Sequence, residues 1–484
     1  MSFVARLFAT KSIEELSAEG GRGHLRRALG ARDLIAVGIG TMIGGGIFTT
    51  IGPGVAKAGP AVLIAYLLAG LASLFAALSY AELGSMVPIA GSAYTYAYAT
   101  LGQLVAWIIG WDLILEYGVS AAPVAQQWSA YVQDALARFG LTLPIWAKTA
   151  HYAFAGAWWH VDWTHTQVDL LGALFILGLS GLLALGIRET AAGNNLAVII
   201  KVGALLVFIV AGSFLIHPAN LVPFAPLGWL HGSSGIVPAA ALVFFSFIGF
   251  DTATTTAEET RNPARDVPIG VIGSLIIGTV LYCAVAFVLV AVVPWQKVDQ
   301  NAALAAALRP LHQPILDAII ILGALAGTTS VALTSLLGQT RIFYVMARDR
   351  MLPPFVAAIN PRFRTPARMT MITGAVVAFL TLIVPLDTLL ELVNIGTFSA
   401  FIIVCAGVIY LRYKRPDLPR PFRSPFVPFF PLCGIGLCLF LSTQGLGPFT
   451  WIRFIVWLAI GLIIYFAYGF RHSLPSQGPP RRRA

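Results

Sequence analysis

The sequence predicts an all-α membrane protein of twelve transmembrane helices. Of its 484 residues, 58% are hydrophobic and only 11% are charged, and the mean hydropathy is +0.81. Soluble domains do not have this composition. About 20 apolar residues cross the roughly 30 Å hydrocarbon core of a bilayer, and the chain contains twelve such stretches. The segments between these stretches are alternately rich and poor in basic residues, which also indicates repeated crossing of the membrane.

The twelve spans follow one another with few long connections. The apolar pattern is least regular in the segment 85–102 and at the short gap near Asp387. The spans are expected at residues 33–56, 61–85, 102–135, 168–187, 194–216, 236–258, 268–293, 313–345, 369–385, 387–411, 426–443 and 450–470.

The distribution of positive charge predicts the orientation. With both termini placed in the cytoplasm, 24 of the 31 Lys and Arg residues fall in inner segments, six fall in outer segments, and Lys201 lies inside a span. This is the positive-inside pattern, and it favours an even number of spans. The net charge of +10 therefore reflects topology and not a nucleic-acid partner. The first 32 residues have no apolar core, so no cleavable signal peptide is expected, and a plasma or inner membrane location follows.

Cysteine and histidine suggest no cofactor. All four cysteines fall inside predicted spans, which argues against a disulfide framework or a metal site. The histidines of the outer loops have no i, i+4 spacing on a convincing helix, and Trp158 and Trp159 in the same loops are typical of interface anchors. The histidines concerned are His151, His160, His165, His217, His231 and His312.

Two spans carry an interruption. Gly44, Gly45 and Gly46 lie in the middle of the first span, where each glycine costs about 0.5–1 kcal/mol relative to alanine in a helix. The sixth span has Gly249 and Asp251 at a corresponding place, about 205 residues later. Broken spans at matching positions of two halves predict an inverted-repeat transporter with its binding site at the breaks. The alternative is that these glycines only allow close helix packing, although packing glycines favour a spacing of four.

The repeat defines the expected organisation of the chain. An odd number of spans per repeat makes the second half inverted relative to the first, and two helices remain as an appendix. The expected parts are a cytoplasmic segment 1–32, a five-helix repeat 33–216, an inverted repeat 236–411, helices 11 and 12 at 426–470, and a basic cytoplasmic tail 471–484.

Four motifs resemble a known family. They are LRRALGARDL at 25–34, GTMIGGGIF at 40–48, GFDTATTTAEETRNP with RDVPIG at 249–270, and GQTRIFY with MARD at 338–349. From about residue 25 to 470 the chain resembles the amino acid, polyamine and organocation (APC) transporter superfamily, in the branch of the cationic amino acid transporters. The resemblance implies the LeuT-type fold, amino acid transport by alternating access, and no redox or metal cofactor.

The backbone at the two breaks is expected to bind the amino acid head group. The N–H groups of Gly44, Gly45 and Gly46 lie at the positive end of a half-helix, which suits an anion. The resemblance assigns the substrate α-carboxylate to this loop. Carbonyl oxygens suit the α-ammonium group, and those expected to receive it belong to Met42, Phe245, Ser246 and Ile248.

Lys201 is the candidate for proton coupling. It lies near mid-depth of the fifth span, where a charge costs at least about 2.5–3.5 kcal/mol. Some resembling transporters carry a lysine here whose ammonium takes the place of a sodium ion, which implies coupling to protons. The alternatives are a snorkelling or structurally paired lysine, and sodium coupling through hydroxyl ligands in the eighth span. Those ligands would be Thr328, Thr329 and Ser330.

The side-chain pocket is expected to contain Glu116, Phe250, Asp251 and Ser335. Acids inside a membrane are functional candidates, and the resemblance would make Glu116 and Asp251 partners of a cationic substrate side chain. The alternative is that the two acids pair with each other's neighbours or with Lys201. Phe250 is a candidate gate, with core packing as its alternative, and small Ser335 leaves room for a longer side chain.

The remaining acids are weaker candidates. Glu82 and Asp112 are expected to do little in binding, and Glu82 is expected to cap or pair locally at the inner end of its span. Glu258 and Glu259 lie beside Arg261 and Arg265, where a solvated helix end competes with a salt-bridge gate.

The sequence gives less support to an enzyme, a channel or a receptor than to a transporter. No nucleophile and base set or metal cluster has a recognisable spacing, so an enzyme is not predicted. A channel would not need the paired breaks or Lys201, and an amino acid receptor would differ only in not moving its ligand. The expected partners are an amino acid, protons and membrane lipid, without nucleic acid. An accessory single-span helix is not testable from the sequence, which also leaves open the amino acid, the stoichiometry, the oligomeric state, and symport against exchange or facilitated diffusion.

Overall fold

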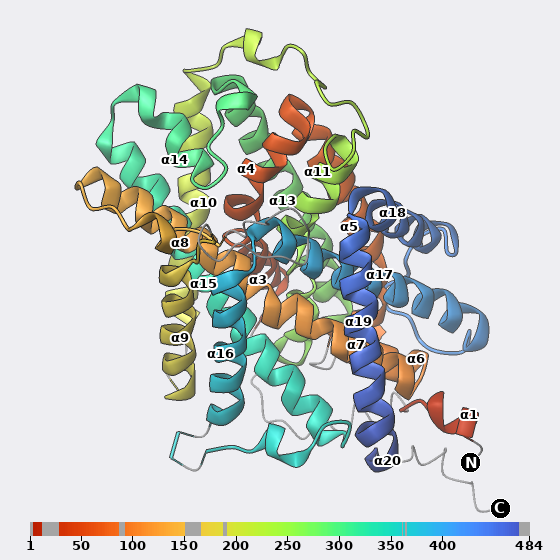
Figure 1. The fold of residues 1–484 in the computed structure, drawn as a ribbon. Helices are drawn as coiled ribbons and strands as arrows, with labels where there is room; N and C mark the ends of the chain where they lie inside the picture. Colours follow the sequence, from red (N-terminus) through yellow and green to blue (C-terminus); the bar gives the residue numbers. More distant parts are fainter. Residues whose placement is uncertain are drawn as a thin grey trace, which may run out of the picture.

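The computed structural model describes residues 3–11, 29–86, 92–150, 166–186, 191–360, 362–363 and 365–473. Every regular element in this part of the chain is helical, and the isolated β-bridges there include Leu29 with Thr260 and His231 with Ser234. Among the described residues, eight helical stretches are long and apolar enough to cross a membrane, and three shorter apolar helices accompany them. The expectation of an all-helical membrane protein is confirmed (Figure 1).

The helices of the first half follow the first five predicted spans closely. Two of these spans are divided, the first between α3 and α4 and the third by the π-helix η2. The elements are α3 (Ala31–Met42), α4 (Gly46–Ala58), α5 (Val62–Met86), α7 (Gln103–Leu113), η2 (Ile114–Val119), α8 (Ala121–Arg138), α9 (Leu170–Ala184) and α10 (Ala191–Ser213).

The second half corresponds to the remaining spans. Its first span is divided into a helix, a 3-10 turn and a short helix, and Val384 and Pro385 separate α16 from α17. The elements are α11 (Ile236–Val243), η5 (Phe244–Phe247), α12 (Thr252–Thr255), α13 (Pro263–Val292), α15 (Pro314–Arg348), α16 (Ala367–Ile383), α17 (Leu386–Lys414), α18 (Phe429–Gly445) and α19 (Pro448–Ile464).

Short helices lie between or beside these elements. The irregular segment 85–102 resolves into the end of α5 and a separate helix α6 (Ser92–Thr100), while α14 (Ala303–Leu308) precedes α15. The terminal helices α1 (Phe3–Leu7) and α20 (Phe470–His472) meet through the rings of Phe3 and Phe470, whose centroids are 5.0 Å apart. The described ends of the chain therefore lie at the same end of the bundle (Figure 1), as an even number of crossings requires.

One of the eight long apolar stretches consists of two helices, α4 and α5. Residues Gly46–Met86 form a run of 41 residues, and at about 1.5 Å per residue a straight helix of that length would measure about 60 Å, twice the bilayer core. The chain turns at Gly59, whose φ of 62° favours glycine, and α4 and α5 are separate rods in Figure 1. Twelve crossings and an inverted 5+5 repeat, with the five parts expected from the sequence, remain predictions.

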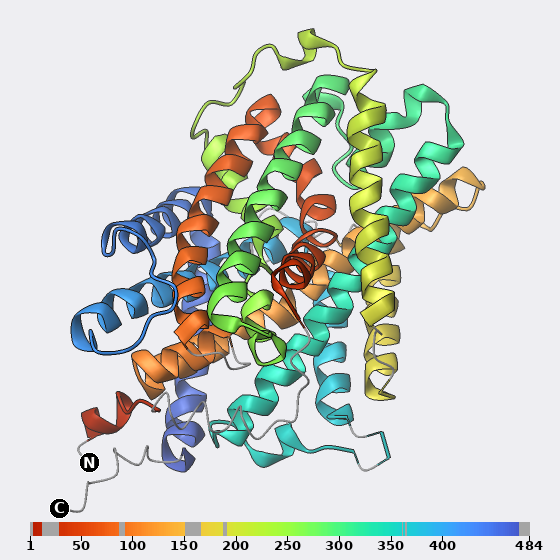
Figure 2. The same cartoon turned by 180° about the vertical axis from the view of Figure 1, so that it is seen from behind.

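The divided helices lie in the core. The stretch Ile236–Thr255 is the most buried of the candidate spans, at 83%, and Pro448–His472 is the least buried, at 22%. Figures 1 and 2 show α9 and α16 on one side of the bundle and α18 and α19 on the other. The two interruptions are therefore enclosed by other helices, where irregular backbone is tolerated in a membrane protein.

Candidate functional site

The first break lies at the glycine run. Helix α3 ends at Met42, Ile43 is extended, and Gly44 has a φ of 126°. Helix α4 then begins at Gly46, so the irregular backbone covers residues 43–45 and Gly46 is its first helical residue. The predicted interruption is present, one residue earlier than the glycine run itself.

Close packing explains why glycine is needed here. A Cβ on Gly44 would lie 2.6 Å from the carbonyl oxygen of Gly327 in α15, and a Cβ on Gly46 would lie 2.6 Å from Cα of Ser246 in η5. Because both neighbours are backbone atoms, neither could move aside like a flexible side chain. These glycines therefore allow close packing of the helices as well as the break in the first span.

The second break lies in the matching span and contacts the first. After η5, Ile248 is extended and Gly249 has a φ of 112°. Thr41 Oγ1 of α3 donates to the carbonyl oxygen of Gly249 over 2.7 Å. The hydroxyl groups of Thr50 and Ser246 are 2.6 Å apart, and Thr50 Oγ1 is also 2.9 Å from Tyr66 Oη. Side-chain hydroxyls thus join the two interrupted helices.

The break in the first span leaves backbone donors available. Helix α4 starts at Gly46, so its first N–H groups have no acceptor within the helix. Among the described residues, the N–H groups of Gly44, Gly45 and Gly46 form no backbone hydrogen bond outside α4. All three residues are buried. Because buried N–H groups nearly always have an acceptor, these three are suited to a bound anion.

The predicted carbonyl acceptors differ in availability. The carbonyl oxygen of Phe245 already accepts a hydrogen bond of 3.2 Å from the N–H of Ile248. Met42 is the last residue of α3, so its carbonyl lies at the negative end of that half-helix. Ser246 packs directly on Gly46. The structure therefore brings Ser246 to the glycine run and leaves Phe245 with one lone pair for a ligand.

Lys201 reaches the same place from α10. Its side chain is fully buried, and its Nζ donates to the carbonyl oxygen of Gly40. Gly40 belongs to the last turn of α3, where carbonyls lack partners within the helix and carry partial negative charge. The lysine therefore holds the end of the first half-helix, and snorkelling does not describe it.

The hydroxyl residues proposed as sodium ligands point to different places. Thr328 is buried and donates to the carbonyl oxygen of Ala324 over 2.7 Å, within its own helix. Thr329 and Ser330 line an apolar groove of about 890 Å³ between α9, α10 and α15. The three side chains therefore do not converge on one point.

Glu116 lies in the π-helix η2, a rare conformation that often occurs at functional sites. The residue is 2% exposed, and among the described residues neither carboxylate oxygen has a hydrogen-bond partner. Asp251 and Asp112 are near enough to interact with it electrostatically. Tyr117, the next residue, donates to Asp251 Oδ2 over 3.2 Å. Asp251 therefore pairs with a neighbour of Glu116, as the structural alternative expected.

The remaining two pocket candidates, Phe250 and Ser335, pack against different neighbours. Phe250 packs edge-on against Tyr80, with ring centroids 5.7 Å apart, and against Phe401 at 5.3 Å. Ser335 of α15 contacts Ser120, whose Oγ is 3.3 Å from its own. Phe250 thus belongs to an aromatic cluster, and Ser335 lies at the junction of η2 and α8.

Several residues near the site were not predicted. Gly327 and Thr41 contact the breaks, Tyr66 contacts Thr50, and Tyr80 packs against Phe250. Gln339 lies against Gly118 of η2. A glycine in the middle of the eighth span was a usable sign for Gly327. The hydroxyl residues had none, because a buried Thr or Tyr is common in any membrane helix.

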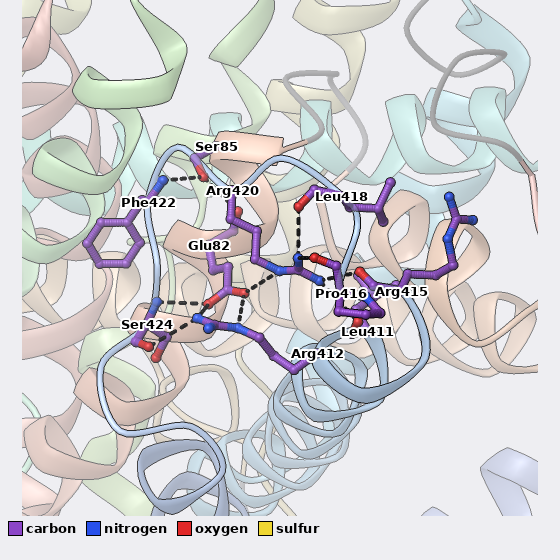
Figure 3. Close-up of polar contacts among 10 residues, drawn as sticks. All are labelled: Glu82, Ser85, Leu411, Arg412, Arg415, Pro416, Leu418, Arg420, Phe422 and Ser424. Carbon is purple, nitrogen blue, oxygen red and sulfur yellow. Dashed lines mark hydrogen bonds and ion pairs between the residues drawn. The ribbon is translucent and has the colours of Figure 1, made fainter.

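The prediction that Glu82 caps or pairs locally is wrong. It does not pair locally, because its carboxylate accepts two hydrogen bonds, of 2.9 and 2.8 Å, from Arg412, which lies 330 residues away in α17. Arg420 Nε is 3.4 Å from Oε1, and the N–H of Ser424 donates to Oε2 over 2.8 Å (Figure 3). These contacts tie the connection between α17 and α18 to the end of α5.

The remaining features considered from the sequence are a metal site, a salt-bridge gate and the residues of an outer loop. Within the described ranges, no group of three or more His, Cys, Asp or Glu residues could hold a metal ion, and the four cysteines are free. Glu259 has no ion pair there, and its carbonyl oxygen accepts from the N–H of Leu29 over 3.0 Å. The predictions for Trp158, Trp159, His151, His160 and His165 lie outside the described residues.

The fold and this site define a class of protein: a multi-pass helical membrane protein with two interrupted helices joined in its core. The chain belongs to the amino acid permease family, because the model of that family matches residues 29–466. The predicted resemblance to the APC superfamily is confirmed, and the function supported is amino acid transport.

Three relatives illustrate the range of the family. The branched-chain amino acid permease BcaP of Bacillus subtilis is 45% identical, over 97% of this chain and 99% of its own. The methylthioribose transporter of the same organism is 40% identical over the same shares. The vacuolar cationic amino acid transporter 4 of Arabidopsis thaliana is 36% identical, over 82% of this chain and 65% of its own.

Proposed function

We propose that the protein is a secondary active transporter that takes up amino acids by alternating access, driven by protons. The observation that carries this proposal is the meeting of three elements at one place. The N–H groups of the glycine run follow Ile43, the second break packs on Gly46, and Lys201 holds the carbonyl end of α3. Helix α3 packs against both α10 and α12, so it connects the lysine to the second break.

Backbone groups would recognise the part that all amino acids share. The N–H groups of Gly44, Gly45 and Gly46 would receive the α-carboxylate at the positive end of α4. The carbonyl oxygens of Met42, Ser246 and Ile248 would receive the α-ammonium group, with Phe245 contributing its remaining lone pair. Because these groups belong to the backbone, they favour an amino acid without selecting its side chain.

Lys201 would couple this site to protons. A protonated amine donates strongly to the Gly40 carbonyl and balances the negative end of α3. A neutral amine donates weakly, so loss of the proton would loosen α3 from α10 and favour its movement. The scattered hydroxyl groups of Thr328, Thr329 and Ser330 make sodium coupling the weaker alternative, because a hard cation requires several oxygen ligands around one point.

Glu116 and Asp251 would select cationic or a broad range of side chains. A buried carboxylate whose oxygens accept no hydrogen bond is costly unless a cation or a proton compensates it. A substrate ammonium or guanidinium group would compensate Glu116. The second candidate is a branched-chain neutral substrate, which the permease with 45% identity favours and which the aromatic contacts of Phe250 would accommodate.

The expected surroundings complete the proposal. The transporter would lie in the cell or inner membrane with both termini in the cytoplasm, because basic residues concentrate at that end. Its helices would form a LeuT-type 5+5 inverted repeat with two further helices. Exchange-type transport and an amino-acid-sensing receptor are the competing functions.

The test is uptake of labelled amino acids into proteoliposomes, with imposed pH and sodium gradients applied separately. We expect accumulation with the pH gradient alone and its loss in Lys201→Met. Lys297→Met is the matched control, since Lys297 is exposed, and should transport normally. Accumulation that needs sodium, or that persists in Lys201→Met under a pH gradient, would refute proton coupling through this lysine. Binding of a labelled amino acid without any uptake would favour an amino-acid-sensing receptor.

A further inference from the structure

We propose that a groove between the first turns of α13 and the connection between α17 and α18 binds an anionic phospholipid. The groove has a volume of about 510 Å³, within the range of roughly 300–1,000 Å³ typical of small-molecule sites. One wall is α13, with Arg265, Ile269, Ile272 and Gly273, and the other is Pro421 and Phe422. Arg265 is the only charged residue among those that line it.

The arrangement along the groove matches an amphipathic ligand. Arg265 is exposed in the first turn of α13, and Ile269 and Ile272 follow it one and two turns deeper into the predicted span. The exposed face of the helix continues with Ile276, which is 51% exposed. A phosphate at Arg265 would therefore place an acyl chain along the isoleucines, a surface that a free inorganic phosphate would not use.

Charge at the mouth of the groove favours an anionic head group. Arg261 precedes α13 and Arg423 follows Phe422, and both are exposed. Of the acids nearby, Glu259 is half-buried two residues before Arg261 and makes no ion pair among the described residues. Asp266 is buried, and Asp417 is held by Arg415 at 3.2 Å. Basic residues next to a membrane attract anionic lipids by about 1 kcal/mol each.

The second wall of the groove is fixed before any lipid binds. Arg420, immediately before Pro421, lies against Glu82, and the N–H of Phe422 donates to Ser85 Oγ over 3.3 Å. Ser424 donates its N–H to the same Glu82 (Figure 3). Residues on both sides of Pro421 and Phe422 are thus tied to α5, so the groove does not have to be ordered by its ligand.

A lipid in this groove would join parts of the molecule that belong to different elements. Helix α13 follows the second break in sequence and packs against α3, which carries the first break, and against α5. The connection from α17 to α18 is tied to α5. An anionic lipid bridging them would hold the inner end of α13 in place, and we expect it to support transport without touching the substrate.

The experiment measures lipid retention by mass spectrometry of the intact protein, purified in mild detergent from liposomes of equal parts phosphatidylglycerol and phosphatidylcholine. The wild type is expected to retain one phosphatidylglycerol in preference to phosphatidylcholine. Arg265→Gln should reduce this preference by about fivefold. Ile269→Trp, which fills the apolar part and keeps the arginine, should also reduce it. Arg368→Gln is the matched control, because Arg368 is an exposed arginine in the first turn of α16 and should leave it unchanged.

Each outcome decides the proposal. Equal retention of the two lipids by the wild type would overturn it, as would unchanged retention in both Arg265→Gln and Ile269→Trp. An equal loss in Arg368→Gln would show that general surface charge attracts the lipid and would also overturn it. Thermal unfolding of each variant in detergent, compared with the wild type, separates lost lipid from lost folding.

Discussion

Two buried glutamates at different depths of the bundle have opposite surroundings. Glu82, at the end of α5, is bound by two arginines and a backbone N–H. Glu116, in η2, has two carboxylates nearby, and among the described residues neither of its oxygens accepts a hydrogen bond. Both residues are at most 2% exposed. Burial alone therefore does not distinguish a structural acid from a functional one.

The difference lies in what compensates the charge. The protein itself neutralises Glu82, so that this carboxylate needs no ligand to compensate its charge. Nothing among the residues described around Glu116 supplies a positive charge, so the compensation must come from a proton or a ligand. A buried acid left without a partner is a site at which the molecule can change state, and substitutions at the two glutamates and their neighbours test this contrast.

The largest expected effect is on folding. Glu82→Ala leaves Arg412 and Arg420 without their carboxylate, and breaking such a buried pair costs about 3–5 kcal/mol. We expect a clear fall in the thermal unfolding midpoint in detergent, while the protein that remains folded at low temperature transports normally. An unchanged midpoint would mean that the arginines do not depend on Glu82.

Glu116→Gln should have the opposite effect to Glu82→Ala: it should reduce transport and leave stability intact. The amide loses no hydrogen bond that the carboxylate made, so the unfolding midpoint should stay the same or rise. Uptake of arginine should fall by about ten- to a hundredfold, as expected for losing a hydrogen bond to a charged group of about 1.5–3 kcal/mol. Leucine uptake, measured in the same liposomes, should change little. Equal losses for both amino acids would contradict a role in side-chain selection.

Arg412→Lys tests how far the stability of the Glu82 ion pair depends on the geometry of its donors. Lysine keeps the charge but cannot present the two parallel donors that now bind Oε1 and Oε2 of Glu82. The loss of one charge-assisted hydrogen bond should destabilise the protein by about 1.5 kcal/mol. The measurement is again thermal unfolding, with Arg453→Lys, at an exposed arginine, as the control. A loss as large as in Glu82→Ala would show that geometry matters as much as charge.

The smallest effect is expected at the hydrogen bond beside Glu116. Tyr117→Phe removes the donor to Asp251, an ordinary hydrogen bond worth about 1 kcal/mol. Substrate affinity should change by less than about tenfold, and the unfolding midpoint should fall slightly. A complete loss of binding would mean that Asp251 contacts the substrate only when Tyr117 orients it, and would move the tyrosine into the binding site.

Local sequence patterns predicted the elements well because each depends on few neighbours. The apolar runs located the helices within a few residues, and the glycines at 44–46 and 249 located both breaks, since left-handed or closely packed backbone excludes larger residues. The positions of Lys201 and Glu116 inside spans were also visible. Their neighbours in space were not, because Gly40 reaches Lys201 and Asp251 reaches Glu116 only through helix packing.

Glu82 shows the limit most clearly. Its sequence neighbours suggested a local role, yet Arg412 lies 330 residues away. Nothing in the sequence by itself distinguishes an acid that meets a distant arginine from one that meets another acid.

The sequence by itself determined that this is a helical membrane protein of the amino acid permease family with two interrupted helices, because hydropathy, charge and glycine act locally along the chain. Only the tertiary structure decided that the two breaks touch, that Lys201 holds the end of α3, and that Glu82 is neutralised while Glu116 is not. Those facts depend on which helices are neighbours, and the free energy of a buried charge is set by the groups around it in space.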